Sequence, residues 1–209
     1  LDQLAAEMPM TQLHFHKCCL GEGEYEDPLG TLTGDEWWNR RNGQKVQPMV
    51  VINGGEPVVG SIAGTYDNFK ALAENKVEYT TYNTQGNAIN VNLSLGWEPS
   101  GNSTGIVTWK VGENDEETSK IDASSLIPEN YNPSIYMSLF VVEDSIYFPE
   151  GSNGLENYHY VVRDIFGLGN VSGETEITLP EIYDGDDLSL VLVLEVNGWK
   201  IIEKSCGEY

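Results

Sequence analysis

The feature that most constrains the fold is a change of sequence pattern near residue 76. From there to the C-terminus the chain consists of runs that alternate apolar and polar residues or are rich in β-branched residues, separated by Gly, Asn and Pro. Such runs predict strands, because successive side chains of a strand point to opposite faces. The predicted strands cover residues 77–83, 88–96, 105–111, 134–143, 156–166, 173–179, 188–197 and 199–204. Several short strands at this spacing predict a β-sandwich.

The first 76 residues have a mixed pattern. Apolar residues at helical spacing predict a helix at the N-terminus that ends at Pro9, and Thr33 is expected to cap a second helix that starts at Gly34. Strands are predicted at 12–18, 48–52 and 58–62, followed by a helix over 65–75 whose apolar stripe is Tyr66, Phe69, Leu72 and Ala73. We therefore expect two domains, residues 1–76 and residues 77–209, the second a sandwich of the immunoglobulin type.

The chain is strongly acidic. Its 209 residues include 33 Asp and Glu against 11 Lys and Arg, for a formal net charge of −22 at pH 7. Such a charge repels phosphate backbones and anionic lipids, so we expect neither nucleic acid nor a membrane surface as a partner. No apolar run approaches the roughly 20 residues that a membrane-spanning helix needs. Because the chain begins inside a predicted helix, we also expect upstream residues in the full-length protein.

One apolar strand is entered through a proline, Pro48, and left through a turn at 53–55. Other distinctive segments are Asp27-Pro28-Leu29-Gly30, the strand ending in His16, the helix at 64–67 and the strand segments 139–144 and 158–164. In these segments the chain resembles the outer membrane protein 28-related family, whose members join a thioredoxin-like domain to a β-sandwich. The resemblance implies an exported protein, located outside the cell, at its surface or in the periplasm. It also implies an α/β thioredoxin-like N-terminal domain and a cis peptide bond before Pro48.

The chain departs from this family in its cysteines. Family members commonly carry a Cys-x-x-Cys at the start of the first helix, whereas the three cysteines here are Cys18, Cys19 and Cys206, which form no such motif. The N-terminal domain is therefore expected to lack its first strand and its redox motif. All three cysteines are candidates for disulfides, because an exported chain is expected to oxidise at least one pair. The neighbouring pair can close only a strained ring, so Cys206 or an upstream residue are alternative partners.

Two groups of residues are candidate metal ligands. His14, His16 and Cys18 share one face of a predicted strand, and their side chains suit zinc or copper. Asp184, Asp186 and Asp187 offer carboxylate oxygens on a turn, which suit calcium. A half-exposed strand end and a solvated acidic loop are the alternative interpretations.

Two further features bear on the surface of the protein. Asn92, Asn102 and Asn170 each begin an Asn-x-Ser/Thr pattern and are candidate glycosylation sites in a glycosylating host. Five tryptophans and eleven tyrosines are enough for a sugar-binding or protein-binding platform if several face solvent, although sandwich cores also use aromatic residues.

These observations favour a protein that is not an enzyme. We expect an exported or cell-surface structural, adhesion or assembly protein that binds other proteins, including copies of itself through its edge strands. The alternative hypothesis is a thiol-disulfide oxidoreductase whose Cys-x-x-Cys lies upstream of Leu1.

Overall fold

The structure is a computed structural model of the chain. It describes residues 2–8, 10–18, 27–42, 49–52, 58–59, 65–74, 81–82, 88–89, 91–113, 135–151, 154–169, 171–181, 188–196 and 200–208.

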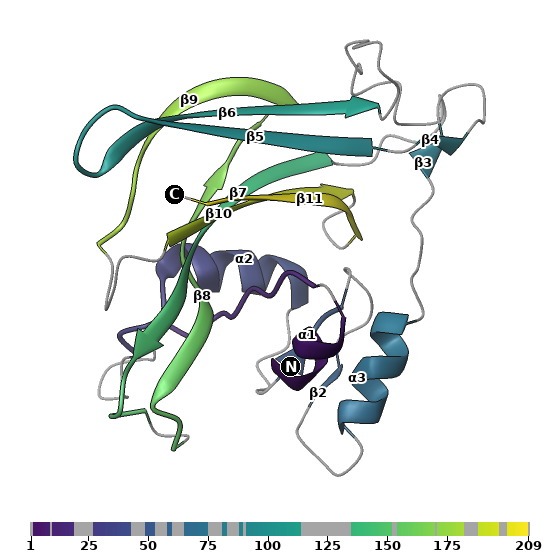
Figure 1. The fold of residues 1–209 in the computed structure, drawn as a ribbon, viewed down its shortest axis with the longest axis vertical. Helices are drawn as coiled ribbons and strands as arrows, with labels where there is room; N and C mark the ends of the chain where they lie inside the picture. The colour runs from purple at the N-terminus through teal and green to yellow at the C-terminus, as the bar shows by residue number, and fades with distance from the viewer. Residues whose placement is uncertain are drawn as a thin grey trace.

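Seven strands form two antiparallel sheets that stack on each other (Figure 1). The larger sheet has the order β11-β10-β7-β8 and the smaller has the order β5-β6-β9. At one flank of the stack β5 and β11 lie side by side. The strand bounds are β5 Val91–Pro99, β6 Thr104–Glu113, β7 Ile135–Tyr147, β8 Asn157–Gly167, β9 Ser172–Thr178, β10 Leu188–Val196 and β11 Lys200–Glu208. The predicted β-sandwich is confirmed.

The main core lies between the two sheets and is filled by alternate residues of their strands. From the smaller sheet and the loops that follow β8 and β9 come Leu93, Val107, Trp109, Val111, Leu168, Ile177 and Leu179. From the larger sheet come Met137, Leu139, Val141, Leu188, Leu190, Leu192 and Leu194. The intervening residues of β7 and β10 are buried as well, on the opposite face.

That opposite face is covered by the N-terminal part of the chain, which forms a third layer. Residues 10–18 and helix α2 (Leu32–Asn42) lie against it, as Figure 1 shows. The Phe15 ring stacks on Trp37 with 4.6 Å between centroids, and both rings meet Phe140 of β7 edge-on. The central strands β7 and β10 are therefore buried on both faces over most of their paired length, which accounts for their unbroken apolar runs. Phe15 and Trp37 lie before the domain boundary expected near residue 76, and Phe140 lies after it. Both predicted domains therefore contribute to this aromatic cluster.

Residues 12–16 also extend the larger sheet at its edge. His14 forms a parallel bridge with Val161 of β8. Its amide donates to the Tyr160 carbonyl at 2.8 Å, and its own carbonyl accepts from the Val162 amide at 2.9 Å. Backbone pairing thus attaches the third layer to the sandwich at β8.

The remaining helices pack on each other. In α1 (Asp2–Glu7) Leu4 is buried, in α3 (Thr65–Glu74) Phe69 is buried, and Glu7 accepts from Lys70 at 2.7 Å. Leu72, which was predicted to share the apolar stripe of α3, is instead exposed. Two short antiparallel pairs complete the described elements: β1 Met49–Val50 with β2 Val58–Val59, and β3 Thr81–Tyr82 with β4 Ala88–Ile89.

The start of α2 differs from the prediction. The helix begins at Leu32, and its N-terminal cap is Thr31 rather than Thr33. Thr31 Oγ1 accepts from the Gly34 amide at 3.0 Å, and the Thr31 carbonyl accepts from the Asp35 amide at 3.0 Å. This leaves the Thr33 hydroxyl available for a contact with another layer.

Among the described residues, none of the helices has the length and apolar character required to span a bilayer.

Candidate functional site

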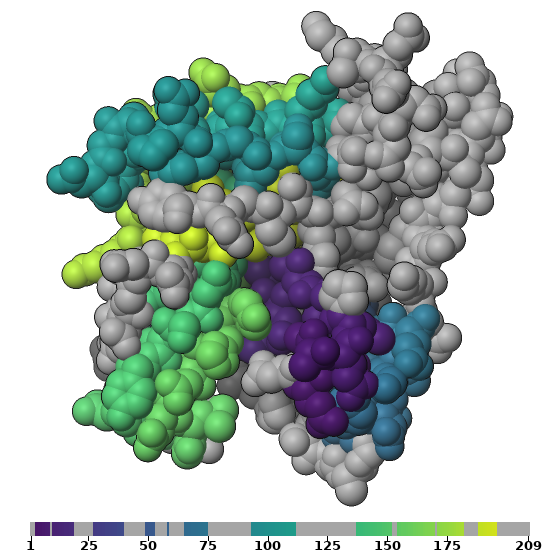
Figure 2. All heavy atoms as spheres, in the orientation of Figure 1, coloured from purple at the N-terminus to yellow at the C-terminus, as the bar shows by residue number. Residues whose placement is uncertain are grey.

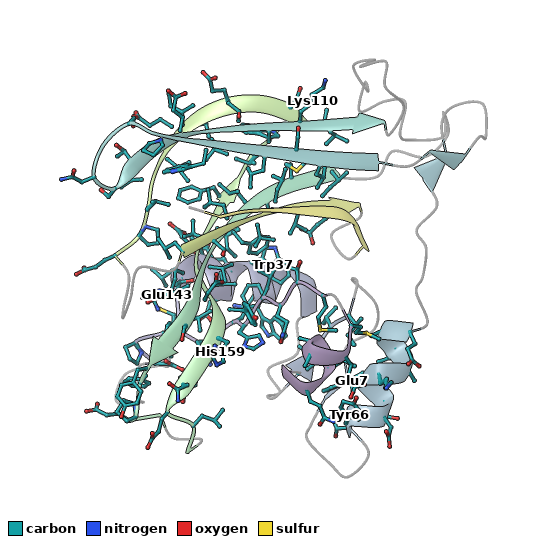
Figure 3. All side chains as sticks on the ribbon, viewed as in Figure 1. Glu7, Trp37, Tyr66, Lys110, Glu143 and His159 are labelled. Carbon is teal, nitrogen blue, oxygen red and sulfur yellow. The ribbon has the colours of Figure 1, made fainter. Side chains whose placement is uncertain are left out.

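A group of buried and half-buried charged side chains lies where the third layer meets the ribbon formed by β7 and β8. We call this group, composed of His16, Asp27, Glu143, Arg163 and Asp164, the polar seam. Two members come from the N-terminal layer, and three come from the sandwich. Figure 3 shows Glu143 on β7 within the ribbon.

The Asp27-Pro28-Leu29-Gly30 segment is a tight turn that inserts an apolar side chain beside the seam. Asp27 Oδ1 accepts from the Leu29 amide at 2.9 Å, and the Asp27 carbonyl accepts from the Gly30 amide at 3.0 Å. Leu29 is fully buried in a cluster with Ile146, Phe148, Tyr158 and Val161. A Cβ atom at Gly30 would collide with the backbone of Cys18, so only glycine permits this close approach.

The same aspartate holds His16. His16 Nδ1 donates to Asp27 Oδ2 at 2.8 Å, and the imidazole meets the Tyr158 ring edge-on with 5.3 Å between centroids. Partial burial raises the pKa of Asp27, but the hydrogen bonds from His16 and the Leu29 amide, with the positive charge of Arg163, outweigh it. The net effect is a pKa below the ordinary value, which means that the carboxylate form is stabilised.

Arg163 joins the turn to the sandwich. Its Nε lies 3.4 Å from Oε2 of Glu143, whose side chain is fully buried. Its guanidinium also donates to the Leu29 carbonyl at 3.3 Å. A buried carboxylate requires such a partner, because an uncompensated charge in the interior is strongly destabilising.

Asp164 makes the second connection. Asp164 Oδ1 accepts from the Thr33 hydroxyl at 2.9 Å and from the Ile165 amide at 2.7 Å. Because Thr33 lies in the first turn of α2, this bond positions the helix relative to β8. The polar seam therefore links residues that are about 130 positions apart in the sequence.

The seam is arranged to fasten two layers together. Two hydrogen bonds cross between the N-terminal layer and the ribbon, from Thr33 to Asp164 and from Arg163 to the Leu29 carbonyl. The contacts of His16 with Asp27 and of Arg163 with Glu143 hold the residues on each side in place. Such buried, mutually paired groups contribute orientation and specificity of packing.

The structure gives the predicted zinc or copper ligands separate partners. His14 Nε2 donates to Gln12 Oε1 at 3.0 Å, whereas His16 is held by Asp27. The Cys18 amide donates to Asp35 at 3.4 Å. Within the described part of the chain, no set of three His, Cys, Asp or Glu side chains is placed to hold a metal ion. Each histidine also lies beside a different tyrosine of β8, Tyr160 for His14 and Tyr158 for His16.

Several predicted site residues lie outside what the structure describes. These are Pro48, Cys19, Asn170 and the three aspartates Asp184, Asp186 and Asp187, together with the side chains of Asn92 in β5 and Cys206 in β11. Asn102 is described, and it lies exposed in the loop between β5 and β6.

The sequence indicated that Glu143 and Arg163 need partners, but its local pattern did not indicate that they pair with each other. Glu143 and Arg163 each follow an unbroken apolar run, and charged residues in such positions are rarely buried without a partner. Their pairing depends on the register Glu143↔Val161 between β7 and β8 and on a register irregularity beside Arg163.

Comparison with protein-family models, with curated proteins and with solved structures finds no match to this chain.

Proposed function

We propose that the protein is an exported or cell-surface structural and assembly protein without catalytic activity, and that copies associate through the open edge of β9. The observation that carries the proposal is this edge: among the strands that the structure describes, β9 pairs with β6 alone, on one side. The use of the polar seam for fastening the layers also supports a structural role. We further propose that the sandwich is immunoglobulin-like and that the location is the cell surface, the exterior or the periplasm.

The hydrogen-bond pattern defines which backbone groups of β9 face outward. The Leu179 amide donates to the Ser103 carbonyl at 2.7 Å, and the Val111 amide donates to the Val171 carbonyl at 2.9 Å. With the register Thr104↔Thr178 through Lys110↔Ser172, these bonds place the odd-numbered amides of β9 toward β6. The even-numbered amides, including that of Glu174, therefore point away from β6 toward the open edge.

The edge is guarded by charge. Glu174 and Glu176 have exposed side chains, and carboxylates on an edge strand oppose pairing with an identical edge. The formal net charge of −22 adds a general repulsion between copies. Because salt shortens the Debye length from about 10 Å at 0.1 M to about 3 Å at 1 M, association is expected to strengthen with ionic strength.

Sedimentation velocity over a concentration series, at about 0.1 M and about 1 M NaCl, tests the proposal with two variants at one position. Glu174→Thr removes the charge and keeps the amide, so it is expected to associate at lower salt than the wild type. Glu174→Pro removes the outward amide and is expected to stay monomeric, while its β6 pairing is retained. A wild type that remains monomeric at high concentration and high salt, or a Glu174→Pro variant that associates like the wild type, would contradict the proposal.

A second candidate is a thiol-disulfide oxidoreductase with a thioredoxin-like N-terminal domain. It is favoured by the succession of β1, β2 and α3 directly after Pro48, since an antiparallel hairpin followed by a helix continues such a domain beyond its proline. This function requires a Cys-x-x-Cys upstream of Leu1. Reduction of insulin disulfides by the full-length protein supports it, and a full-length sequence without that motif excludes it.

A further inference from the structure

Three of the outer edges of the two sheets already have a neighbour. β5 and β11, the outer strands at one flank, lie side by side. The outer edge of β8 is paired with His14, whose backbone hydrogen-bonds with Tyr160 and Val162. Among the described strands of the two sheets, this leaves the outer edge of β9 without a neighbouring strand. Figures 1 and 2 show the outer end of the β7–β8 ribbon, in green, extending away from the smaller sheet at the top.

This arrangement determines the symmetry of an association through β9. If β9 of one copy met a different edge of the next copy, that edge would first have to be uncovered, and the contact could repeat along an open filament. When both copies use the same strand, a two-fold axis relates them and the assembly closes after two copies. The edges that the structure leaves uncovered therefore favour pairing of β9 with β9.

The hydrogen-bond pattern of β9 limits the registers that such a pair can adopt. The even-numbered residues of the strand point their amides and carbonyls toward the open edge, because the odd-numbered ones bond to β6. In a two-fold pair the even-numbered residues must face each other, so the axis passes through one residue of the strand. With the axis at Thr175, the midpoint of the strand, Ser172 meets Thr178 and Glu174 meets Glu176. An axis one residue away in either direction leaves one end of β9 unpaired.

Charge also distinguishes the registers. Ser100 Oγ donates to Glu176 Oε1 at 2.9 Å. The Ser100 amide donates to the Thr104 carbonyl at 2.9 Å, so Ser100 lies on the β5 side of β6, and its hydroxyl directs the Glu176 carboxylate over β6, away from the open edge. With the axis at Thr175, Glu174 faces a carboxylate that is turned away from it. An axis at Glu174 would instead place that residue opposite its own copy, where like charges repel.

From this geometry we propose that β9 pairs antiparallel with β9 of a second copy about a two-fold axis at Thr175, and that this pairing closes a dimer. The inference rests on the self-association proposed above and adds its symmetry and register. At the axis the two Thr175 residues form a non-hydrogen-bonded pair, and a Thr–Thr pair across strands is favourable. Because β9 has seven residues, the interface is small beside the roughly 1,600 Å² of a standard one, so we expect a reversible dimer.

Disulfide trapping with introduced cysteines tests the register. The proteins are oxidised with diamide at high concentration in about 1 M NaCl and run on non-reducing gels. The wild type gives the baseline for the three native cysteines. Thr175→Cys is expected to shift to twice the monomer mass, because a non-hydrogen-bonded pair places its Cα atoms about 4.5 Å apart, within reach of a disulfide.

The matched control is Thr178→Cys, on the same strand. With the axis at Thr175, the two copies of residue 178 lie about 20 Å apart, so this variant should stay at the baseline. A mixture of Ser172→Cys and Thr178→Cys brings the two cysteines opposite each other and should again give the linked dimer. Both positions are exposed, so these substitutions leave the core unchanged.

Different results decide this inference and the proposal on which it rests. Sedimentation of the wild type and of Glu174→Pro shows whether copies associate through β9 at all, and a negative result there overturns both. If copies do associate through β9 but Thr175→Cys and the mixture stay at the baseline, the axis at Thr175 is refuted and self-association stands. Trapping of Glu174→Cys instead would place the axis at Glu174. Species larger than a dimer that grow with concentration in sedimentation would overturn the closed two-fold pair.

Discussion

Leu29 is expected to anchor the N-terminal layer to the sandwich, and its truncation gives the most direct measure of that attachment. Its side chain is fully buried against Ile146, Phe148, Tyr158 and Val161. Leu29→Ala removes apolar volume worth about 0.8 kcal/mol for each CH₂ group. The four neighbours are held by strand pairing and cannot close the cavity completely, so the total loss is expected to be about 3 kcal/mol. This corresponds to more than about a hundredfold change in the unfolding equilibrium.

Urea unfolding at pH 7, followed by tryptophan fluorescence, measures this loss. With a slope of about 2–3 kcal/mol per molar urea, the midpoint of Leu29→Ala should fall by about 1 M or more. Leu32→Ala makes the same chemical change only three residues away, but that side chain is 64% exposed, so its stability should change by less than about 0.5 kcal/mol. If the two variants lose similar stability, the attachment of the N-terminal layer through Leu29 is refuted.

Three other predictions concern the polar seam and the sandwich. Because the pKa of Asp27 is lowered in the folded protein, its contribution is present above about pH 4 and is lost as pH falls through the folded-state pKa. Asp27→Asn should therefore be less stable than the wild type at pH 6, with a smaller difference at pH values near 2, measured by urea unfolding; an equal difference at both would contradict this. Gly105→Ala should cost about 1–3 kcal/mol and alter the near-ultraviolet circular dichroism, because its Cβ would collide with a tryptophan ring of β5. Gly167→Ala, where a Cβ meets open space, should be neutral or slightly stabilising by thermal unfolding, and equal losses at the two glycines would argue against the tryptophan contact. Arg163→Ala should cost about 3–5 kcal/mol in urea unfolding, because it leaves the Glu143 carboxylate buried without its cation, and a loss below about 1 kcal/mol would be inconsistent with that pair.

Strand positions were largely predictable because they depend on local periodicity. The alternating runs predicted at 105–111, 156–166 and 188–197 correspond closely to β6, β8 and β10. β7 begins near the predicted start at residue 134 but extends to Tyr147, four residues beyond the prediction. In this extension β7 pairs with β8 but no longer with β10, and the sequence of β7 does not indicate where its pairing with β10 stops.

The spacing of the histidines could be predicted from the sequence, but their hydrogen-bond partners could not. His14 and His16 do lie two residues apart along an extended segment, as predicted, and each meets a tyrosine of β8. Their hydrogen-bond partners are Gln12 and Asp27. The strand that supplies both tyrosines lies more than 140 residues away in the sequence, so its position beside the histidines could not be predicted from local pattern.

The sequence by itself determined the acidic surface, the β-rich second half and the approximate bounds of the helices, because charge and periodicity are properties of neighbouring residues. Only the tertiary structure decided that residues 10–18 and α2 cover the outer face of the larger sheet at its central strands and that Arg163 meets both Glu143 and the turn at Leu29. An alternating strand shows that its two faces differ, and an unbroken apolar run shows that both are buried. Neither pattern specifies which distant segment covers each face, because that depends on strand order, register and the packing of side chains across layers.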